Sequence, residues 1–109
     1  MEQITPSQVA AWAQAQAQRP VLLDVREGWE VQTASVSPDG LDLLHMPMQT
    51  VPARLAELDR QRPVACLCHH GGRSMQVAHF LEAQGYAVAN VAGGIHAWAT
   101  QVDPSIAVY

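Results

Sequence analysis

One seven-residue segment combines the residue types that nucleophilic chemistry requires. It runs Cys68-His69-His70-Gly71-Gly72-Arg73-Ser74. The thiolate is the reactive form of cysteine, and the positive end of a helix together with a nearby arginine stabilises it. The two glycines let the loop turn so that backbone N–H groups face a bound anion. We therefore expect Cys68 to be a nucleophile and residues 69–74 to form its binding loop.

Two histidines and a second cysteine flank Cys68. Cys66 lies two residues earlier on the same predicted strand and shares its face, so we expect Cys66 to pack in the core instead of acting as a resolving thiol. His69 and His70 either adjust Cys68 and contact the substrate or are simply exposed loop residues. These four residues are also a candidate zinc site, but four ligands within five residues cannot readily surround one ion. We expect no metal and no cofactor.

The elements that position this loop follow from hydrophobic patterning. Continuous apolar runs at 21–25 and 64–68 are typical of strands buried on both faces of a parallel sheet. Further strands are expected near Ile4, at 42–46 and at 88–91, with helices at 6–18, 27–34, 51–58, 73–84 and after Gly94. This α/β alternation predicts about five mainly parallel strands with helices on both faces. Ligands bind at the carboxyl ends of such strands, where the Cys68 loop begins.

Charged residues close the first long apolar run. Asp24 lies within the run 21–25, and Arg26 directly follows it. A structural ion pair is the expectation for two opposite charges at a strand end. The alternative is a supporting role in the site, because the same sheet edge borders the Cys68 loop.

Composition sets limits on the fold and on the partners. The chain has 109 residues, of which 49% are hydrophobic and 15% charged, with no apolar run long enough to span a membrane. We expect a single globular domain over 1–109, with a core of about 4–100 and an extended tail at 101–109. Ten acidic and six basic residues give a net charge of −4, which argues against a nucleic-acid partner. No secretory signal precedes Thr5, so we expect a cytoplasmic protein without membrane attachment.

Three segments are similar to the rhodanese-like sulfurtransferases. The family's Cys-x-x-Gly-x-Arg-Ser loop is matched by Cys68, Gly71, Arg73 and Ser74. The segment Leu23 to Glu27 resembles the family's Asp-Val-Arg segment, and Asn90 to Trp98 resembles its late Gly-Gly-x-x-x-Trp segment. The segments occur in the family's order and cover about residues 4–100. The tail resembles the ending of small stand-alone bacterial members.

This resemblance implies a rhodanese-like fold and an enzyme that carries sulfane sulfur as a persulfide on Cys68. The donor would be thiosulfate, a polysulfide or a low-molecular-weight persulfide, and the acceptor a thiol, cyanide or a sulfur-carrier protein. The loop His69, His70, Gly71, Gly72, Arg73 and Ser74 would bind the persulfide, with Arg73 adding positive charge. Many thiosulfate-using members carry basic residues directly after the cysteine, whereas this chain has two histidines there, so the donor stays open.

Two other functions fit parts of the pattern. A non-catalytic binding or redox-sensing module would keep the fold and use Cys68 only as a switch. Phosphatases and arsenate reductases of similar arrangement place five residues between cysteine and arginine. Only four residues separate Cys68 from Arg73, and this shorter loop suits one sulfur atom better than a tetrahedral oxyanion.

Overall fold

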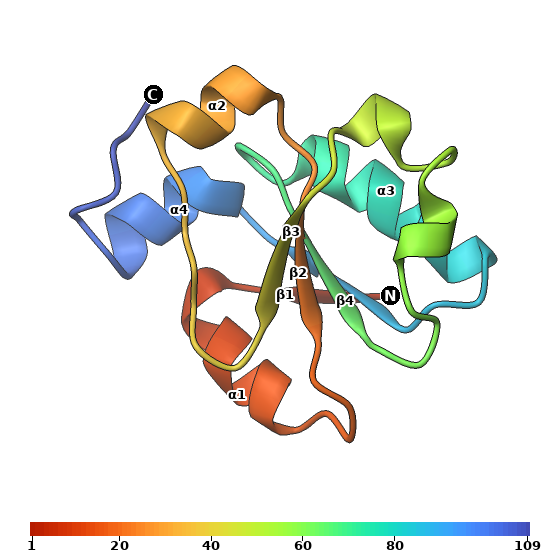
Figure 1. The fold of residues 1–109 in the computed structure, drawn as a ribbon. Coiled ribbons are helices and arrows are strands. Elements are labelled where there is room, and N and C mark those ends of the chain that lie inside the picture. Colours follow the sequence, from red (N-terminus) through yellow and green to blue (C-terminus); the bar gives the residue numbers. More distant parts are fainter.

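Five parallel strands form one sheet in the order β1-β5-β4-β2-β3 in the computed structural model, which describes residues 1–109 (Figure 1). The strands are β1 (Glu2–Ile4), β2 (Val21–Asp24), β3 (Asp42–His45), β4 (Val64–Leu67) and β5 (Val88–Val91). All residues of β2, β4 and β5 are buried, which explains why these strands consist mainly of apolar residues. The predicted fold class is confirmed, and the central strand β4 leads directly into Cys68.

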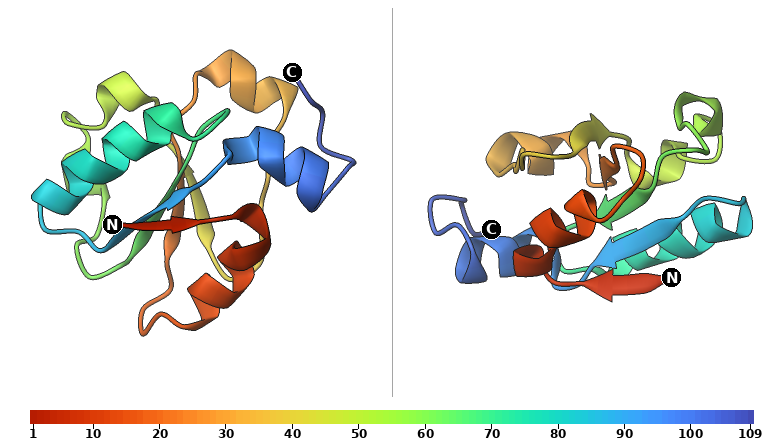
Figure 2. Two further views of the ribbon diagram at one scale, coloured as in Figure 1. Left: turned by 180° about the vertical axis from the view of Figure 1, so that it is seen from behind. Right: turned by 90° about the horizontal axis from the view of Figure 1, so that it is seen from below.

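Helices cover both faces of this sheet (Figures 1 and 2). The 3-10 turn η1 (Pro6–Gln8), helix α1 (Val9–Gln14) and helix α4 (Gly94–Gln101) pack on one face, around Leu22, Ala65 and Trp98. Helix α3 (Gly72–Ala83) and the 3-10 turns η2 (Met48–Thr50) and η3 (Leu55–Glu57) cover the other, around Leu23 and Cys66. Successive strand residues therefore enter opposite cores. Helix α2 (Gly28–Thr33) lies at the carboxyl edge, where β2 ends.

One predicted helix is wrong and another is shorter than expected. The segment 51–58 forms a turn that follows η2 and then η3, and Val51 and Leu58 are nevertheless buried. The apolar periodicity thus indicates which residues are buried and not that the segment is an α-helix. So short a segment gains little free energy from forming one. At the amino end, the Thr5 N–H donates a hydrogen bond to the Gln8 side chain at the start of η1, but α1 ends at Gln14 and not at the predicted residue 18.

The residues after α4 differ from the predicted extended tail. The carboxylate of Asp103 accepts hydrogen bonds from the N–H and the hydroxyl of Ser105, and the Ile106 N–H binds the Asp103 carbonyl. This turn reverses the chain, so its end lies beside α2, where the ring centroids of Tyr109 and Trp29 are 5.9 Å apart (Figure 1). The ring of Tyr109 stacks on His69 at 3.9 Å, a partner that no local pattern reveals.

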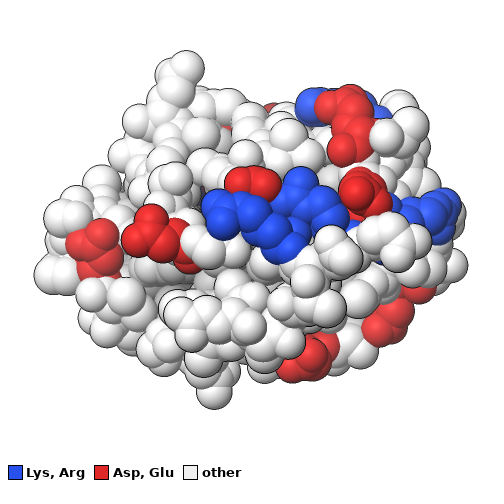
Figure 3. Space-filling model, turned by 60° about the horizontal axis from the view of Figure 1, so that its bottom comes forward, with Lys and Arg blue, Asp and Glu red and all other residues white.

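Charges at the amino edge of the sheet are paired. Arg19 and Arg62 both bind Asp42, at 2.9 and 2.5 Å, where β2, β3 and β4 begin. Figure 3, which brings the bottom of Figure 1 forward, shows basic side chains intermixed with acidic ones on this side of the molecule. None of the helices has the length and apolar character that crossing a membrane requires. The residues suited to chemistry gather at the opposite, carboxyl edge.

Candidate active site

The sulfur of Cys68 lies in a cradle of hydrogen-bond donors. Its Sγ accepts the Gly71 N–H at 3.1 Å and faces the Ser74 hydroxyl at 3.2 Å. The N–H groups of residues 72–74, in the first turn of α3, have no acceptor within the protein. Free N–H groups and the positive end of a 12-residue helix therefore converge beside a buried sulfur. This arrangement stabilises a negative charge on the sulfur or on an atom bound to it.

Gly71 adopts a backbone conformation that few other residues tolerate. Its φ of +104° is left-handed, and a Cβ there would lie 3.1 Å from the backbone nitrogen of Gly93. A Cβ on Gly72 would meet open space, so only Gly71 needs to be glycine on these grounds. Its conformation directs the N–H at the Cys68 sulfur.

A buried asparagine, absent from the sequence-based site, orients this cradle. Asn90 on β5 accepts the Ser74 hydroxyl at 2.5 Å and donates to the Gly71 carbonyl at 3.1 Å and to Gln3 at 3.0 Å. Because one hydroxyl has one proton, Ser74 can donate either to Asn90 or to Cys68. When the Cys68 sulfur becomes an anion, the Ser74 hydroxyl would donate its hydrogen bond to that sulfur instead of to Asn90. The sequence does contain a signal for Asn90, because it is a polar residue within an apolar strand, as Asp24 is.

The start of α4 binds the backbone of the same loop. The N–H groups of Ile95 and His96 bind the carbonyls of Cys68 and His69 at 2.9 and 3.1 Å. Gly94 has a φ of +62°, and a Cβ there would overlap both carbonyl oxygens, at 2.5 Å from that of Cys68. The glycine pair that the sequence analysis noted only as a family segment thus lets α4 approach and fix the loop.

Arg73 does not offer the free positive charge that the sequence suggested. Its guanidinium binds both carboxylate oxygens of Glu30 on α2, at 2.7 and 2.8 Å. The hydrogen bonds from Arg73, helped by one from Tyr109, lower the pKa of Glu30 to about 2, so this carboxylate stays charged near neutral pH. Arg73 therefore ties the start of α3 to α2. Sequence reasoning missed Glu30 because the two residues are distant in the chain.

Asp24 and Arg26 form the predicted ion pair. Two guanidinium nitrogens of Arg26 bind the Asp24 carboxylate at 2.9 and 2.7 Å, and both side chains are buried. The remaining donors reach the carbonyls of Glu30 and Ala34 and the hydroxyl of Tyr109. All five guanidinium donors are thus bound. The pair fixes α2 and the end of the chain at the carboxyl edge of β2.

The remaining predicted residues lie close to Cys68. Cys66 is fully buried in the same hydrophobic cluster, and this burial raises the pKa of its thiol to about 12, which keeps it protonated. His69 and His70 stack at 3.9 Å between ring centroids, and His96 of α4 lies against them. His96 has no role in the sequence analysis, because only the fold brings it to the loop.

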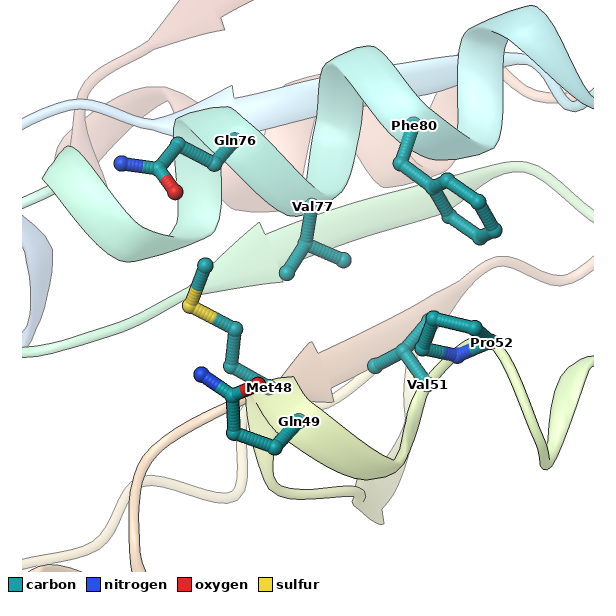
Figure 4. Close-up of a pocket in the computed structure, with 7 residues that line it drawn as sticks. All are labelled: Met48, Gln49, Val51, Pro52, Gln76, Val77 and Phe80. Atoms are coloured by element: carbon teal, nitrogen blue, oxygen red, sulfur yellow. The ribbon is translucent and has the colours of Figure 1, made fainter.

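An apolar pocket of about 250 Å³ opens on the α3 side of the sheet (Figure 4). Val77 and Phe80 of α3 face Val51 and Pro52 across it, and Met48, Gln49 and Gln76 complete its lining. Val51 and Val77 belong to the hydrophobic cluster that contains Cys68, although no residue of the loop 69–74 lines the pocket. The pocket contains no charged residue.

Comparison with known proteins identifies the family. The Rhodanese-like domain family matches residues 5–101. The chain belongs to this family. It is 39% identical over 88 residues to a protein named "Sulfurtransferase" from Allochromatium vinosum, covering 80% of this chain and 78% of that one. It is 40% identical over 89 residues to the chloroplastic "Rhodanese-like/PpiC domain-containing protein 12" of Arabidopsis thaliana, of which it spans only 30%.

Solved structures agree with this assignment. A rhodanese-like domain protein from Staphylococcus aureus matches with a TM-score of 0.77 and 28% identity, covering 100% of this chain and 99% of that one. The polysulfide-sulfur transferase homodimer of Wolinella succinogenes matches with a TM-score of 0.73 and 26% identity, over 93% of this chain and 74% of that one. Two of the relatives that this chain covers over most of their length are thus named as sulfur transferases.

Proposed function

We propose that this protein is a sulfurtransferase that carries sulfane sulfur on Cys68. The thiolate attacks the terminal sulfur of a donor RS–S⁻, so that the new bond joins Sγ to that sulfur while the donor S–S bond breaks and releases RS⁻. An acceptor thiolate R′S⁻ then attacks the outer sulfur of the persulfide. This step forms R′S–S⁻ and regenerates the Cys68 thiolate.

The observation that carries this proposal is the donor set around the Cys68 sulfur. The Gly71 N–H, the Ser74 hydroxyl and the free N–H groups of the first turn of α3 can stabilise both the thiolate and the terminal sulfur of the persulfide. The ion pair between Arg73 and Glu30 argues against the phosphatase alternative, because a phosphate would have to compete with a carboxylate for that guanidinium.

We infer further that the donor is a polysulfide or a low-molecular-weight persulfide in preference to thiosulfate. The chain has no lysine, and Arg26 and Arg73, the arginines near Cys68, are both bound to carboxylates. A dianionic donor would therefore meet backbone dipoles and histidines but no uncompensated cation.

Mass spectrometry of the intact protein tests the proposal. Exposure to polysulfide should add the mass of one sulfur to the wild-type protein and to Cys66→Ala, and a subsequent thiol should remove it. Cys68→Ser should show no such cycle. The single-turnover rate should be higher with glutathione persulfide than with thiosulfate at equal concentration. A wild-type protein that forms no adduct with any donor would favour the binding or redox-sensing module, and faster transfer from thiosulfate would refute the donor assignment alone.

A further inference from the structure

Three histidines from two separate segments meet at the edge of the Cys68 loop. His69 and His70 follow Cys68, and His96 belongs to the first turn of α4. Each ring offers a nitrogen, and these three atoms all lie within 4.8 Å of one another. The hydrogen bond from the His96 N–H to the His69 carbonyl holds the two segments together. Figures 1 and 2 both show the start of α4 beside this loop.

Two of these rings carry a buried nitrogen without a partner. Nε2 of His69 and Nδ1 of His96 are the only buried side-chain nitrogen or oxygen atoms of the chain that make no hydrogen bond. Buried polar atoms almost always have partners, because an unmet hydrogen bond costs about 1–3 kcal/mol. Both unpaired nitrogens therefore belong to one cluster of three imidazoles. A bound ion that accepts nitrogen lone pairs would satisfy them.

We propose that His69, His70 and His96 form a binding site for a divalent transition-metal ion of borderline softness, such as Zn²⁺. Neutral imidazole is a preferred ligand of such ions, whereas Mg²⁺ and Ca²⁺ require oxygen ligands, which this cluster lacks. The site has three protein ligands and leaves a further position open to solvent at the exposed His70.

The site needs only a small adjustment to take an ion. In a tetrahedral site with Zn–N distances near 2.0 Å, ligand nitrogens lie about 3.3 Å apart, so the widest separation has to close by about 1.5 Å. His70 is exposed and can turn away from its stack on His69 to do so. His69 is held on its ring face by Tyr109, and His96 by its helix.

This ligand set differs from the one that the sequence made implausible. Cys66, Cys68, His69 and His70 lie within five residues, whereas His96 approaches from another element and supplies the separated third ligand. Cys68 is not required, because its sulfur is directed at Gly71 and Ser74. The proposed metal site thus shares the loop with Cys68 but does not use its sulfur as a ligand.

Calorimetric titration of the full chain with Zn²⁺ tests the site. The wild-type protein should bind one ion, and His70→Ala and His96→Ala should each bind at least tenfold more weakly. His79→Ala is the matched control, because His79 is an exposed histidine on α3 outside the cluster, and it should bind as the wild type does. Circular dichroism of each variant verifies folding.

The visible spectrum of Co²⁺ bound in place of Zn²⁺ identifies the ligands. Nitrogen-only ligation should give ligand-field bands without intense thiolate-to-metal charge transfer, and Cys68→Ala should leave the spectrum and the affinity unchanged. Charge-transfer bands that disappear in Cys68→Ala would overturn the proposal, because the ion would then sit on the thiolate. Equal Zn²⁺ affinity in the wild type and His96→Ala, or no binding by the wild type, would also overturn it.

Discussion

Helices α3 and α4 both begin after a left-handed glycine at the same edge of the sheet, yet their first turns bind different partners. At α4, the N–H groups of Ile95 and His96 are bound to backbone carbonyls of the Cys68 loop. At α3, the N–H groups of residues 72–74 have no acceptor within the protein, and this turn contains Ser74, whose hydroxyl contacts the Cys68 sulfur. One helix start holds the loop in place, and the other is available to a ligand.

The two helix starts also differ in what anchors them. The start of α4 is fixed by backbone hydrogen bonds, which contain no group that titrates. The start of α3 is fixed by the side chain of Arg73, through Glu30 and, beyond it, Tyr109. The comparison therefore predicts that glycine substitutions disrupt α4 most strongly, while pH acts mainly on the anchor of α3.

The largest expected effect comes from Gly94→Ala. The new Cβ would overlap the carbonyl oxygens of Cys68 and His69 at a φ of +62°, so the loop and α4 must separate. We expect a loss of about 2–5 kcal/mol in unfolding free energy, from left-handed strain and overpacking together. Urea denaturation measures it. Gly28→Ala, whose Cβ meets nothing within 4 Å, is the control, and equal stability of the two variants would contradict the clamping role of α4.

Acid should weaken the anchor of α3. The folded-state pKa of Glu30 is about 2 and its ordinary value is 4.5, so its contribution is complete above about pH 4.5 and is lost as the pH falls toward 2. Between pH 5 and 2 the wild type should therefore lose about 2 kcal/mol more unfolding free energy than Glu30→Gln, allowing for the partial exposure of Arg73. If the unfolding free energies of the wild type and Glu30→Gln changed equally with pH, the ion pair would add no stability.

Gly71→Ala should have a smaller effect on stability and a clear effect on transfer. The left-handed φ of +104° costs about 1–2 kcal/mol for a residue with a side chain. Relieving this strain turns the Gly71 N–H away from the Cys68 sulfur, so we expect persulfide formation to slow by about tenfold or more, since removal of one such donor is costly. Single-turnover kinetics measure the rate. Gly72→Ala, with open space at its Cβ, should slow transfer less, and an equal loss in both would refute the special role of Gly71.

The sequence predicted the parts of this comparison that depend on local patterns. Apolar runs and turn residues located the strands, and the spacing around Cys68 located the loop between β4 and α3. Sequence reasoning could not find Glu30, Asn90, His96 or Tyr109, because each acts through a partner that the fold brings from another element. Arg73 shows the same limit, because its partner also comes from another element. Its position in the loop was evident, but the carboxylate that neutralises it was not.

The smallest expected effect concerns Tyr109, the outermost part of the α3 anchor. Its hydroxyl donates to Glu30 at 2.7 Å and accepts from Arg26 at 3.1 Å, while its ring stacks on His69. Tyr109→Phe keeps the ring and removes both bonds, which should cost about 1–2 kcal/mol at neutral pH. Denaturation at pH 7 measures this loss of unfolding free energy. Tyr86→Phe is the control, because the Tyr86 hydroxyl binds only the backbone carbonyls of Leu55 and Leu58.

The pH dependence distinguishes these two phenylalanine variants. The Tyr109 hydroxyl helps to lower the pKa of Glu30, so its removal should raise that pKa and move the acid-induced loss of stability to higher pH. Tyr86→Phe should lower stability by a similar amount at every pH, since no carboxylate receives its bond. If the acid midpoint of Tyr109→Phe equalled that of the wild type, the hydroxyl would only fill space beside the carboxylate. The anchor of α3 would then consist of Arg73 and Glu30 alone.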